Sequence, residues 1–185
     1  MDVNFKFKKA AKVDPVRIEQ VFAEKPGGGL MANPSFEVAP TTAVAEVNGK
    51  FVPIKAFRLA AAVVVADTTI KIEKGSGIAV GDVLGHAKKA VACTAVDESN
   101  PDYDLVTVTL GIDIAAGTVL YEAKEASTST SDAVPIHTPS YIVGNRVPAG
   151  QGDFPVRLIN GANIRKETAC IAPEVAALLP LITLV

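Results

Sequence analysis

The chain has 185 residues, with 18 lysines and arginines against 20 acidic residues and a formal net charge of −2. This length suits one compact domain or two small ones, and it can bury a substantial core without disulfide bonds. The slight negative charge disfavours a general nucleic-acid binder, and the lack of tryptophan disfavours an aromatic stacking platform for sugars or single-stranded nucleic acid.

The first twelve residues carry Lys6, Lys8, Lys9 and Lys12 against a single acid, Asp2. Two interpretations stay open: a cationic arm that meets an acidic partner surface, or a solvated and disordered terminus. No apolar segment typical of a secretory signal is visible there, and no apolar run is long enough to span a bilayer. We therefore expect a soluble protein that is made and folded in a cytoplasm.

A short helix is predicted next. Asp14 can cap it, Pro15 suits its first position, and Ile18, Val21 and Phe22 form one narrow apolar stripe. Pro26 and three glycines then end it. So short a helix needs a partner for its stripe, which is this domain, a sister subunit or another protein.

From residue 44 onward the pattern predicts β structure. Asn48-Gly49 lies between two strand-like runs, and Asn-Gly is typical of a tight hairpin turn because both central residues need positive φ. Residues 69–74 alternate, with Ile70 and Ile72 expected to face inward.

The clearest strand is predicted at 105–114. Its apolar residues alternate with polar ones, which is typical of a sheet with one dry and one wet face. The residues expected to face the core are Val106, Val108, Leu110, Ile112 and Ile114.

Two short segments resemble each other. Residues 78–84 and 114–120 both place a glycine turn before a Val-Leu pair. Two readings stay open: a step that recurs in viral decoration modules, or two similar turns in one barrel. The spacing is too irregular for a solenoid.

The carboxyl end is predicted to contain a second hairpin and a small helix. The hairpin joins 154–159 to 162–164 around Asn160-Gly161. Pro173 opens the helix, whose Val175, Leu178 and Leu179 share one face, and Pro180 ends it. Residues 181–185 finish as a buried strand or plug. More aliphatic surface gathers here than one small helix usually buries, which favours a subunit interface.

These patterns together predict a mainly β protein built from a small barrel or sandwich, with an N-terminal arm that carries a short helix and a short C-terminal helix. We expect an arm and connector at 1–42, a barrel-like domain at 43–126 and a hairpin-and-helix segment at 133–185. Whether that last segment stands alone or completes one fold with residues 43–57 stays open.

No chemical site emerges from the sequence. His86 and His137 have no nucleophile or metal partner at a recognisable spacing, and Cys93 and Cys170 are expected to be reduced core residues. An acidic loop at 97–104 could hold Ca²⁺, but a plain turn explains it better. We expect no catalytic residues, no metal and no cofactor.

Several segments resemble the head-decoration or head-fibre proteins of bacteriophages, particularly phages and prophages of gut Bacteroidetes. These segments are TTIKIEKGSGIAVGDVLG, TAVDESNPDYDLVTVTLG, AAGTVLYEA and PVRLINGANIRKETACIAPEVAALLPLITLV. They span roughly residues 42–185, and their motifs are turn and core patterns. The amino-terminal arm has no matching counterpart.

The resemblance implies a structural virion protein on the outside of an icosahedral head, where it decorates the capsid or forms a short fibre. Such a protein stabilises the capsid or mediates surface adhesion; it is no enzyme and is commonly a homotrimer. The implied partner is the major capsid protein, with no nucleic acid or membrane. The lysines of the arm together with Ile18, Val21 and Phe22 become the candidate capsid-binding residues, and Val175, Leu178 and Leu179 the candidate oligomer interface. A host-surface or glycan-binding fibre module is the alternative, and a small hydrolase a more distant one.

Overall fold

The computed structural model describes residues 15, 17–128 and 132–185 of the chain. These residues form fifteen strands and one short helix, so the prediction of a mainly β fold is confirmed. The amino-terminal elements are β1 (Ile18–Glu24), β2 (Gly29–Met31), β3 (Ala43–Val47) and β4 (Lys50–Pro53). The central elements are β5 (Ala56–Arg58), β6 (Thr69–Glu73), β7 (Val83–His86), β8 (Lys89–Ala92), β9 (Ala95–Asp97), β10 (Tyr103–Thr107) and β11 (Val119–Glu122). The carboxyl-terminal elements are β12 (Tyr141–Val143), β13 (Phe154–Val156), β14 (Leu158–Ile164), α1 (Pro173–Ala176) and β15 (Ile182–Leu184).

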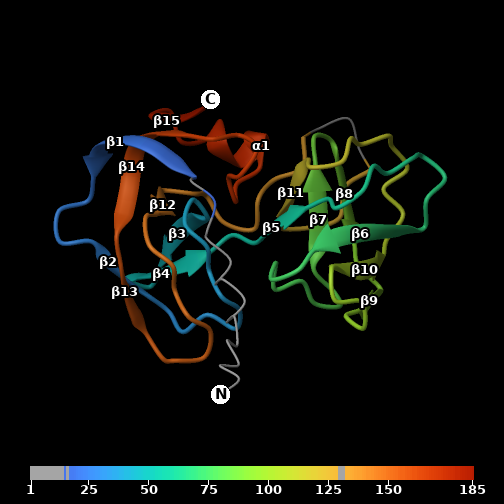
Figure 1. Cartoon of the computed structure of the whole chain (residues 1–185), viewed down its shortest axis with the longest axis horizontal. Helices are drawn as coiled ribbons and strands as arrows, with labels where there is room; N and C mark the ends of the chain where they lie inside the picture. The colour runs from blue at the N-terminus through green and yellow to red at the C-terminus, as the bar shows by residue number, and fades with distance from the viewer. Residues whose placement is uncertain (1–14, 16, 129–131) are drawn as a thin grey trace, which may run out of the picture.

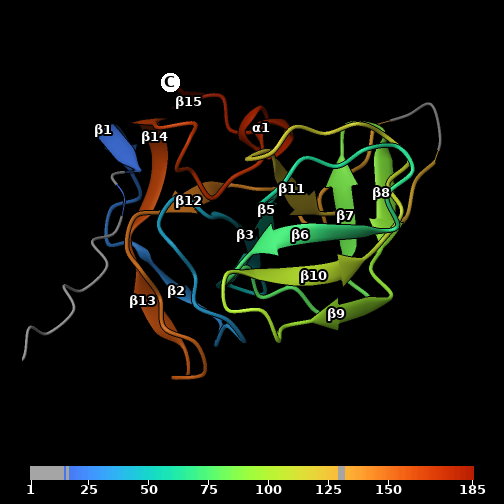
Figure 2. The ribbon, with the colours of Figure 1, turned by 45° about the vertical axis from the view of Figure 1, so that its right-hand side comes forward.

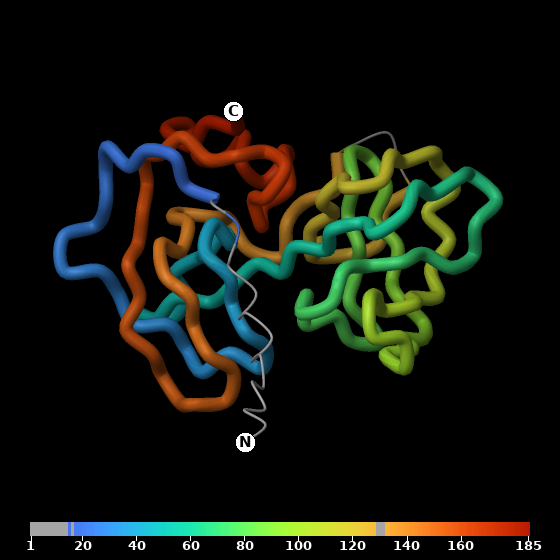
Figure 3. Tube along the Cα trace, in the orientation of Figure 1, coloured from blue at the N-terminus to red at the C-terminus, as the bar shows by residue number. Residues whose placement is uncertain are grey.

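The strands form two lobes that lie side by side (Figure 1). We call residues 17–54 and 138–185 the terminal lobe, which holds β1–β4, β12–β15 and α1, and residues 55–137 the central lobe, which holds β5–β11. The chain therefore crosses from one lobe to the other twice, once after β4 and once before β12 (Figure 3). Both ends of the described chain belong to the same lobe.

A single eight-stranded sheet builds the terminal lobe. Its order is β1-β14-β12-β3-β4-β2-β13. The long strand β14 pairs with β12 at residues 158–159 and with β15 at residues 162–164. Most pairs are antiparallel, but β14 runs parallel to β15 and β2 runs parallel to β4. The sheet curls on itself, so its buried face encloses an apolar core that includes Phe51, Val143 and Leu158 (Figure 2).

The central lobe packs two small sheets together. One has the order β6-β10-β9 and the other β5-β11-β7-β8. Phe57, Leu84, Val106 and Leu120 are all fully buried in the core cluster between them. This packing of two apolar sheet faces is the usual way for short strands to bury their side chains.

The first Asn-Gly hairpin and the strand at 69–74 are confirmed. Asn48 and Gly49 have φ values of 52° and 77°, and Val47 pairs with Lys50 across the two-residue turn. In β6, Ile70 and Ile72 are buried while Lys71 is exposed, as the alternation predicted.

The helix predicted over residues 15–22 is wrong, because strand β1 occupies residues 18–24. β1 pairs with β14 and its register shifts three times, between residues 18 and 20, 21 and 23, and 23 and 24. These irregularities place Ile18, Val21 and Ala23 on the less exposed side, at a spacing of three and then two. A bulged strand thus produced the spacing that resembled a helical stripe.

The hairpin predicted at Asn160-Gly161 is also wrong. Both residues lie inside β14, which runs without a turn from Leu158 to Ile164. Gly161 does not have a positive φ; instead, a Cβ there would lie 2.8 Å from the ring of Phe22 and 2.9 Å from the Cβ of Ala23. The glycine therefore permits the neighbouring strand β1 to lie close against β14.

The strand predicted at 105–114 is shorter than expected. β10 ends at Thr107, and Gly111 bends the chain with a φ of 67°. The residue pattern was nevertheless informative, since Val106, Val108, Leu110 and Ile114 are buried while Ile112 is only partly buried. After β10 ends, every second side chain still points into the core of the central lobe, although the backbone there is irregular.

The two resembling segments become two equivalent turns. Asp82 N–H donates to Ala79 O and Thr118 N–H donates to Ala115 O, and the third residue of each turn is a glycine with positive φ. The strands that follow, β7 and β11, are paired neighbours in one sheet. A similar turn precedes β3, where Thr41 has the positive φ, at 75°.

Candidate interaction surface

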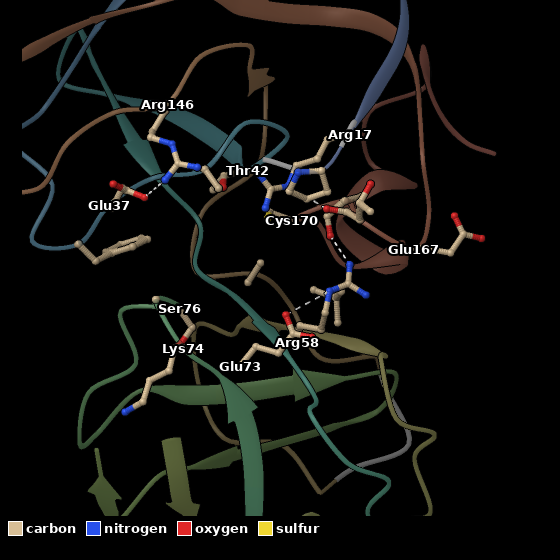
Figure 4. Close-up of a pocket in the computed structure, with 18 residues that line it drawn as sticks. Arg17, Glu37, Thr42, Arg58, Glu73, Lys74, Ser76, Arg146, Glu167 and Cys170 are labelled. Carbon is tan, nitrogen blue, oxygen red and sulfur yellow. Dashed lines mark hydrogen bonds and ion pairs between the residues drawn. The ribbon is translucent and has the colours of Figure 1, made fainter. Parts of the chain in front are cut away.

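The segment 168–176 of the terminal lobe lies against the central lobe and bonds to both lobes. Arg17 Nε donates to Thr168 O at 2.9 Å, and the backbone N–H of Cys170 donates to Thr41 Oγ1 at 2.7 Å, both within the terminal lobe. From the central lobe, Arg58 Nη2 donates to Ala169 O at 2.6 Å (Figure 4). We call residues 168–176 the wedge segment.

A second contact fastens the wedge segment to the central lobe. Glu174 Oε1 lies 3.1 Å from His86 Nδ1 and accepts the backbone N–H of Ala87 at 3.1 Å. Burial raises the pKa of the Glu174 carboxyl, but the contacts with His86 and with Ala87 N–H more than offset this, so the net pKa lies below the usual range. The ionised carboxylate therefore strengthens the contact between the wedge segment and the central lobe.

Apolar packing also crosses the lobe boundary. Val175 and Leu179 belong to one buried cluster with Ile159 of the terminal lobe and Tyr121 of the central lobe. The hydroxyl of Tyr121 donates to Ala133 O at 2.6 Å, and burial raises the pKa of this phenol to about 12. The two lobes thus share part of their core through the wedge segment.

A charged cluster stands where the chain first enters the central lobe. Lys55 Nζ lies 2.7 Å from Asp82 Oδ2 and 3.9 Å from Glu122 Oε1, and all three side chains are largely buried. Burial raises the pKa of Glu122, whereas Lys55 lowers it to a smaller extent. The cluster fixes the crossing segment against the turn before β7 and against β11.

A cleft of about 480 Å³ opens beside the wedge segment, between the lobes. Its charged side chains largely contact one another or the backbone: Arg58 Nε lies 4.0 Å from Glu73, and Arg146 pairs with Glu37 (Figure 4). Arg58 also donates to Gly117 O. Each of these contacts lies within a single lobe, and together they leave little free charge to select a ligand.

Both cysteines are free thiols, as predicted. Cys93 is buried in the central lobe, and burial raises its pKa. Cys170 lines the cleft; burial raises its pKa as well, although Arg17 and Arg58 lower it in part. A reactive cysteine requires a lowered thiol pKa, and neither environment lowers the thiol pKa overall.

The candidate capsid-binding residues divide into two groups. Lys6, Lys8, Lys9 and Lys12 lie outside the described residues. Ile18 and Val21 are half-buried against the core of the terminal lobe, and Phe22 is 55% exposed on strand β1. β1 is therefore an integral strand of the sheet.

The candidate interface residues also divide. Val175 and Leu179 are buried inside the chain, in the cluster that joins the lobes. Leu178 is 50% exposed, and two residues near the carboxyl end, Leu181 and Val185, are exposed to the same extent, at 50% and 51%. The segment at 181–185, predicted as a buried strand or plug, has only Ile182 buried.

These exposed aliphatics border an unpaired strand edge. Ala162 N–H donates to Leu181 O and Val185 N–H donates to Ile164 O, which turns the backbone groups of Thr183 toward β14. The C=O of Ile182 and both backbone groups of Leu184 consequently point away from the sheet. None of these three groups has a hydrogen-bond partner among the residues that the structure describes.

In the described part of the chain, residues 15, 17–128 and 132–185, no group of three or more His, Cys, Asp and Glu side chains is arranged to hold a metal ion. In the same residues, no helix has the length and apolar character needed to cross a membrane.

Comparison with models of protein families, with curated proteins and with solved structures finds no match to this chain. The molecule is therefore characterised by its own geometry: a two-lobed β protein, joined by a wedge segment, with one bare apolar edge.

Sequence reasoning missed the residues that join the lobes. Arg58 and Ala169 are separated by 111 positions, and Ala87 and Glu174 by 87. No local pattern marks such pairs, because their proximity depends on two lobes and two chain crossings. The sequence offered one signal. Thr41 occupies the turn position that Gly81 and Gly117 occupy in the two similar turns before β7 and β11.

Proposed function

We propose that this protein is a structural, non-catalytic component of a virus particle, which decorates the outside of a phage head as a homo-oligomer. Its partner on the particle is the major capsid protein, and it is made in the cytoplasm of the bacterial host. The proposal includes stabilisation of the capsid as the consequence of binding.

The observation that carries this proposal is the bare edge of β15 with its border of exposed aliphatics, Leu178, Leu181 and Val185. Proteins that stay monomeric usually protect a strand edge of this kind, and exposed apolar groups beside it favour burial against another chain. An assembly role accounts for such a surface, and the resemblance of residues 42–185 to head-decoration proteins supplies the kind of assembly.

The joined lobes support the same proposal. A coat component must keep its shape while the particle is under load, and the wedge segment ties both lobes through hydrogen bonds and a shared core. The ion pairs in the cleft, Arg58 with Glu73 and Arg146 with Glu37, leave little free charge to select a small ligand, which suits a structural role.

A particle reconstruction tests the proposal. Heads assembled with and without the protein should differ by density on the outer surface of the head, and decorated heads should resist heat or low salt better. Binding of purified protein to isolated heads should saturate at a fixed number of copies per head. Binding to host cells or glycans without any binding to heads would contradict the proposal, as would turnover of a substrate.

A further inference from the structure

The eight-stranded sheet has three edge strands, β1, β13 and β15, and among the described residues only β15 is unprotected. β1 is bulged at three places and carries the exposed Glu19 and Glu24. β13 contains Pro155, which cannot donate a backbone hydrogen bond. Bulges, charges and prolines are the features that keep sheet edges from pairing with other chains. β15 has none of them: its sequence is Ile-Thr-Leu, and its outward groups are bare.

The chain itself contains a segment suited to this edge. Residues 3–8 read Val-Asn-Phe-Lys-Phe-Lys, so that apolar and polar side chains alternate strictly. Such alternation is typical of a strand that buries one face and exposes the other. These residues lie outside the described part of the chain.

We propose that residues 3–8 of one copy add as a strand to the free edge of β15 in a second copy. Main-chain hydrogen bonds to the outward groups of Ile182 and Leu184 would hold the added strand. Its Val3, Phe5 and Phe7 side chains would cover aliphatics that border the edge, and its lysines would stay in solvent.

The position of Arg17 favours the second copy over the same chain. Arg17 and Pro15 line the cleft between the lobes, and β1 pairs with the side of β14 opposite to β15. Just after the end of β14 that lies nearest residue 17, Lys166 N–H donates to Val185 O and so ties the chain there to the end of β15. Strands β14 and β15 therefore lie between residue 17 and the outer edge of its own β15.

The consequence is a head-to-tail contact, in which each copy donates one strand and accepts another. Such heterologous contacts close into a ring when the rotation between copies permits it. This inference deepens the oligomer of the proposed function: the lysine-bearing face of each added strand would remain free to meet an acidic surface on the head.

The decisive variant is Leu184→Pro. It removes an N–H that has no partner in the described residues, so the fold of the single chain should persist, while strand addition loses a hydrogen bond and meets the proline ring. Leu184→Ala keeps the N–H and is the matched control. Light scattering at micromolar concentration should give an oligomer for the natural chain and for Leu184→Ala, and a monomer for Leu184→Pro; circular dichroism confirms that each variant is folded.

A second pair of variants tests the donated strand without altering β15. Phe5→Gln with Phe7→Gln removes the apolar face and should yield monomers. Lys6→Gln with Lys8→Gln keeps that face and should leave the oligomer intact, whatever its effect on head binding. A synthetic peptide of residues 1–10 should bind to a chain lacking residues 1–14 and should fail to bind when that chain also carries Leu184→Pro.

The outcomes separate the two proposals. A natural chain that is monomeric, or an oligomer that survives Leu184→Pro, overturns strand addition between copies. If the natural chain is a monomer and its own residues 3–8 prevent the peptide from binding to β15, the strand is added within one chain and the proposed contact between copies is wrong. An oligomer that behaves as expected but never binds heads leaves strand addition standing and overturns the proposed function alone.

Discussion

Gly161 lies where the ring of Phe22 and the Cβ of Ala23 come closest to strand β14, and a methyl group there would meet both within 3 Å. We therefore expect Gly161→Ala to destabilise the fold by about 1–3 kcal/mol, the usual cost of overpacking. Urea denaturation measures this loss. Because the exposed ring supplies part of the clash, Phe22→Ala should recover part of the stability in the double variant.

The Gly161→Ala variant also tests why a glycine is needed at this position. The Asn-Gly pattern predicted that Gly161 is needed for positive φ, and this reason is wrong because Gly161 lies within a continuous strand. A cost caused by φ would be the same with or without Phe22. Equal losses in both backgrounds would therefore contradict the packing explanation.

Glu174 provides a pH-dependent contact between the lobes. Its pKa lies below the usual carboxyl range in the folded state, so its ionised form stabilises the fold above that range. The contribution disappears as the pH falls through the folded-state pKa. Glu174→Gln should thus cost about 1–2 kcal/mol at pH 7, in line with charge-assisted hydrogen bonds.

The difference between the natural chain and Glu174→Gln is the quantity to measure, because other carboxyl groups titrate equally in both. Urea denaturation from pH 7 to pH 3 should show this difference shrinking below about pH 4.3, the ordinary glutamate value. A difference that stays constant over this range would show that the carboxylate charge has no part in joining the lobes.

At the scale of elements, the stretch after β10 shows how side chains can keep a buried face when the strand ends. Val108 is buried while Thr109 is exposed, although both follow the last residue of β10. Val108→Asp would bury an unpaired charge, at a cost of several kcal/mol that approaches the whole stability of a domain. We expect this variant to be unfolded by circular dichroism and Thr109→Asp to be folded; equal tolerance would contradict the packing of this stretch.

The sequence predicted elements well where one local rule decided the outcome. The hairpin at Asn48-Gly49 needs only two residues with positive φ, and β6 needs only a period of two. The predictions failed where contacts with a distant element decided the local structure. The bulges of β1 arise from its pairing with β14, and Gly161 makes room for side chains of β1, so neither feature could be seen from its own sequence neighbours.

The candidate surface was predictable only in part for the same reason. An accumulation of aliphatics at the carboxyl end indicated burial, and the structure divides them between the chain's own core, as with Val175, and solvent, as with Leu181. Which residue goes where depends on the wedge segment between the lobes. That placement is a property of the whole topology, since it follows from the two crossings of the chain.

At the scale of the whole molecule, the shared core makes the two lobes depend on each other. Val175 is only 1% exposed and packs in the cluster that contains residues of both lobes. If the wedge segment couples the lobes, they should unfold in one transition, and the calorimetric and van't Hoff enthalpies should agree.

Val175→Ala tests this coupling, because it removes buried methyl groups at the joint and nowhere else. We expect a loss of about 2 kcal/mol, at the lower end of the range for larger side chains truncated to alanine. Hydrogen exchange should lose protection equally in β10 of the central lobe and in β14 of the terminal lobe, since both open only with the whole molecule. Val80→Ala, at a valine that is 65% exposed, is the matched control and should leave both strands unchanged. Loss of protection confined to β14 would show instead that the lobes are separate units, which the wedge segment holds in contact without making their folding cooperative.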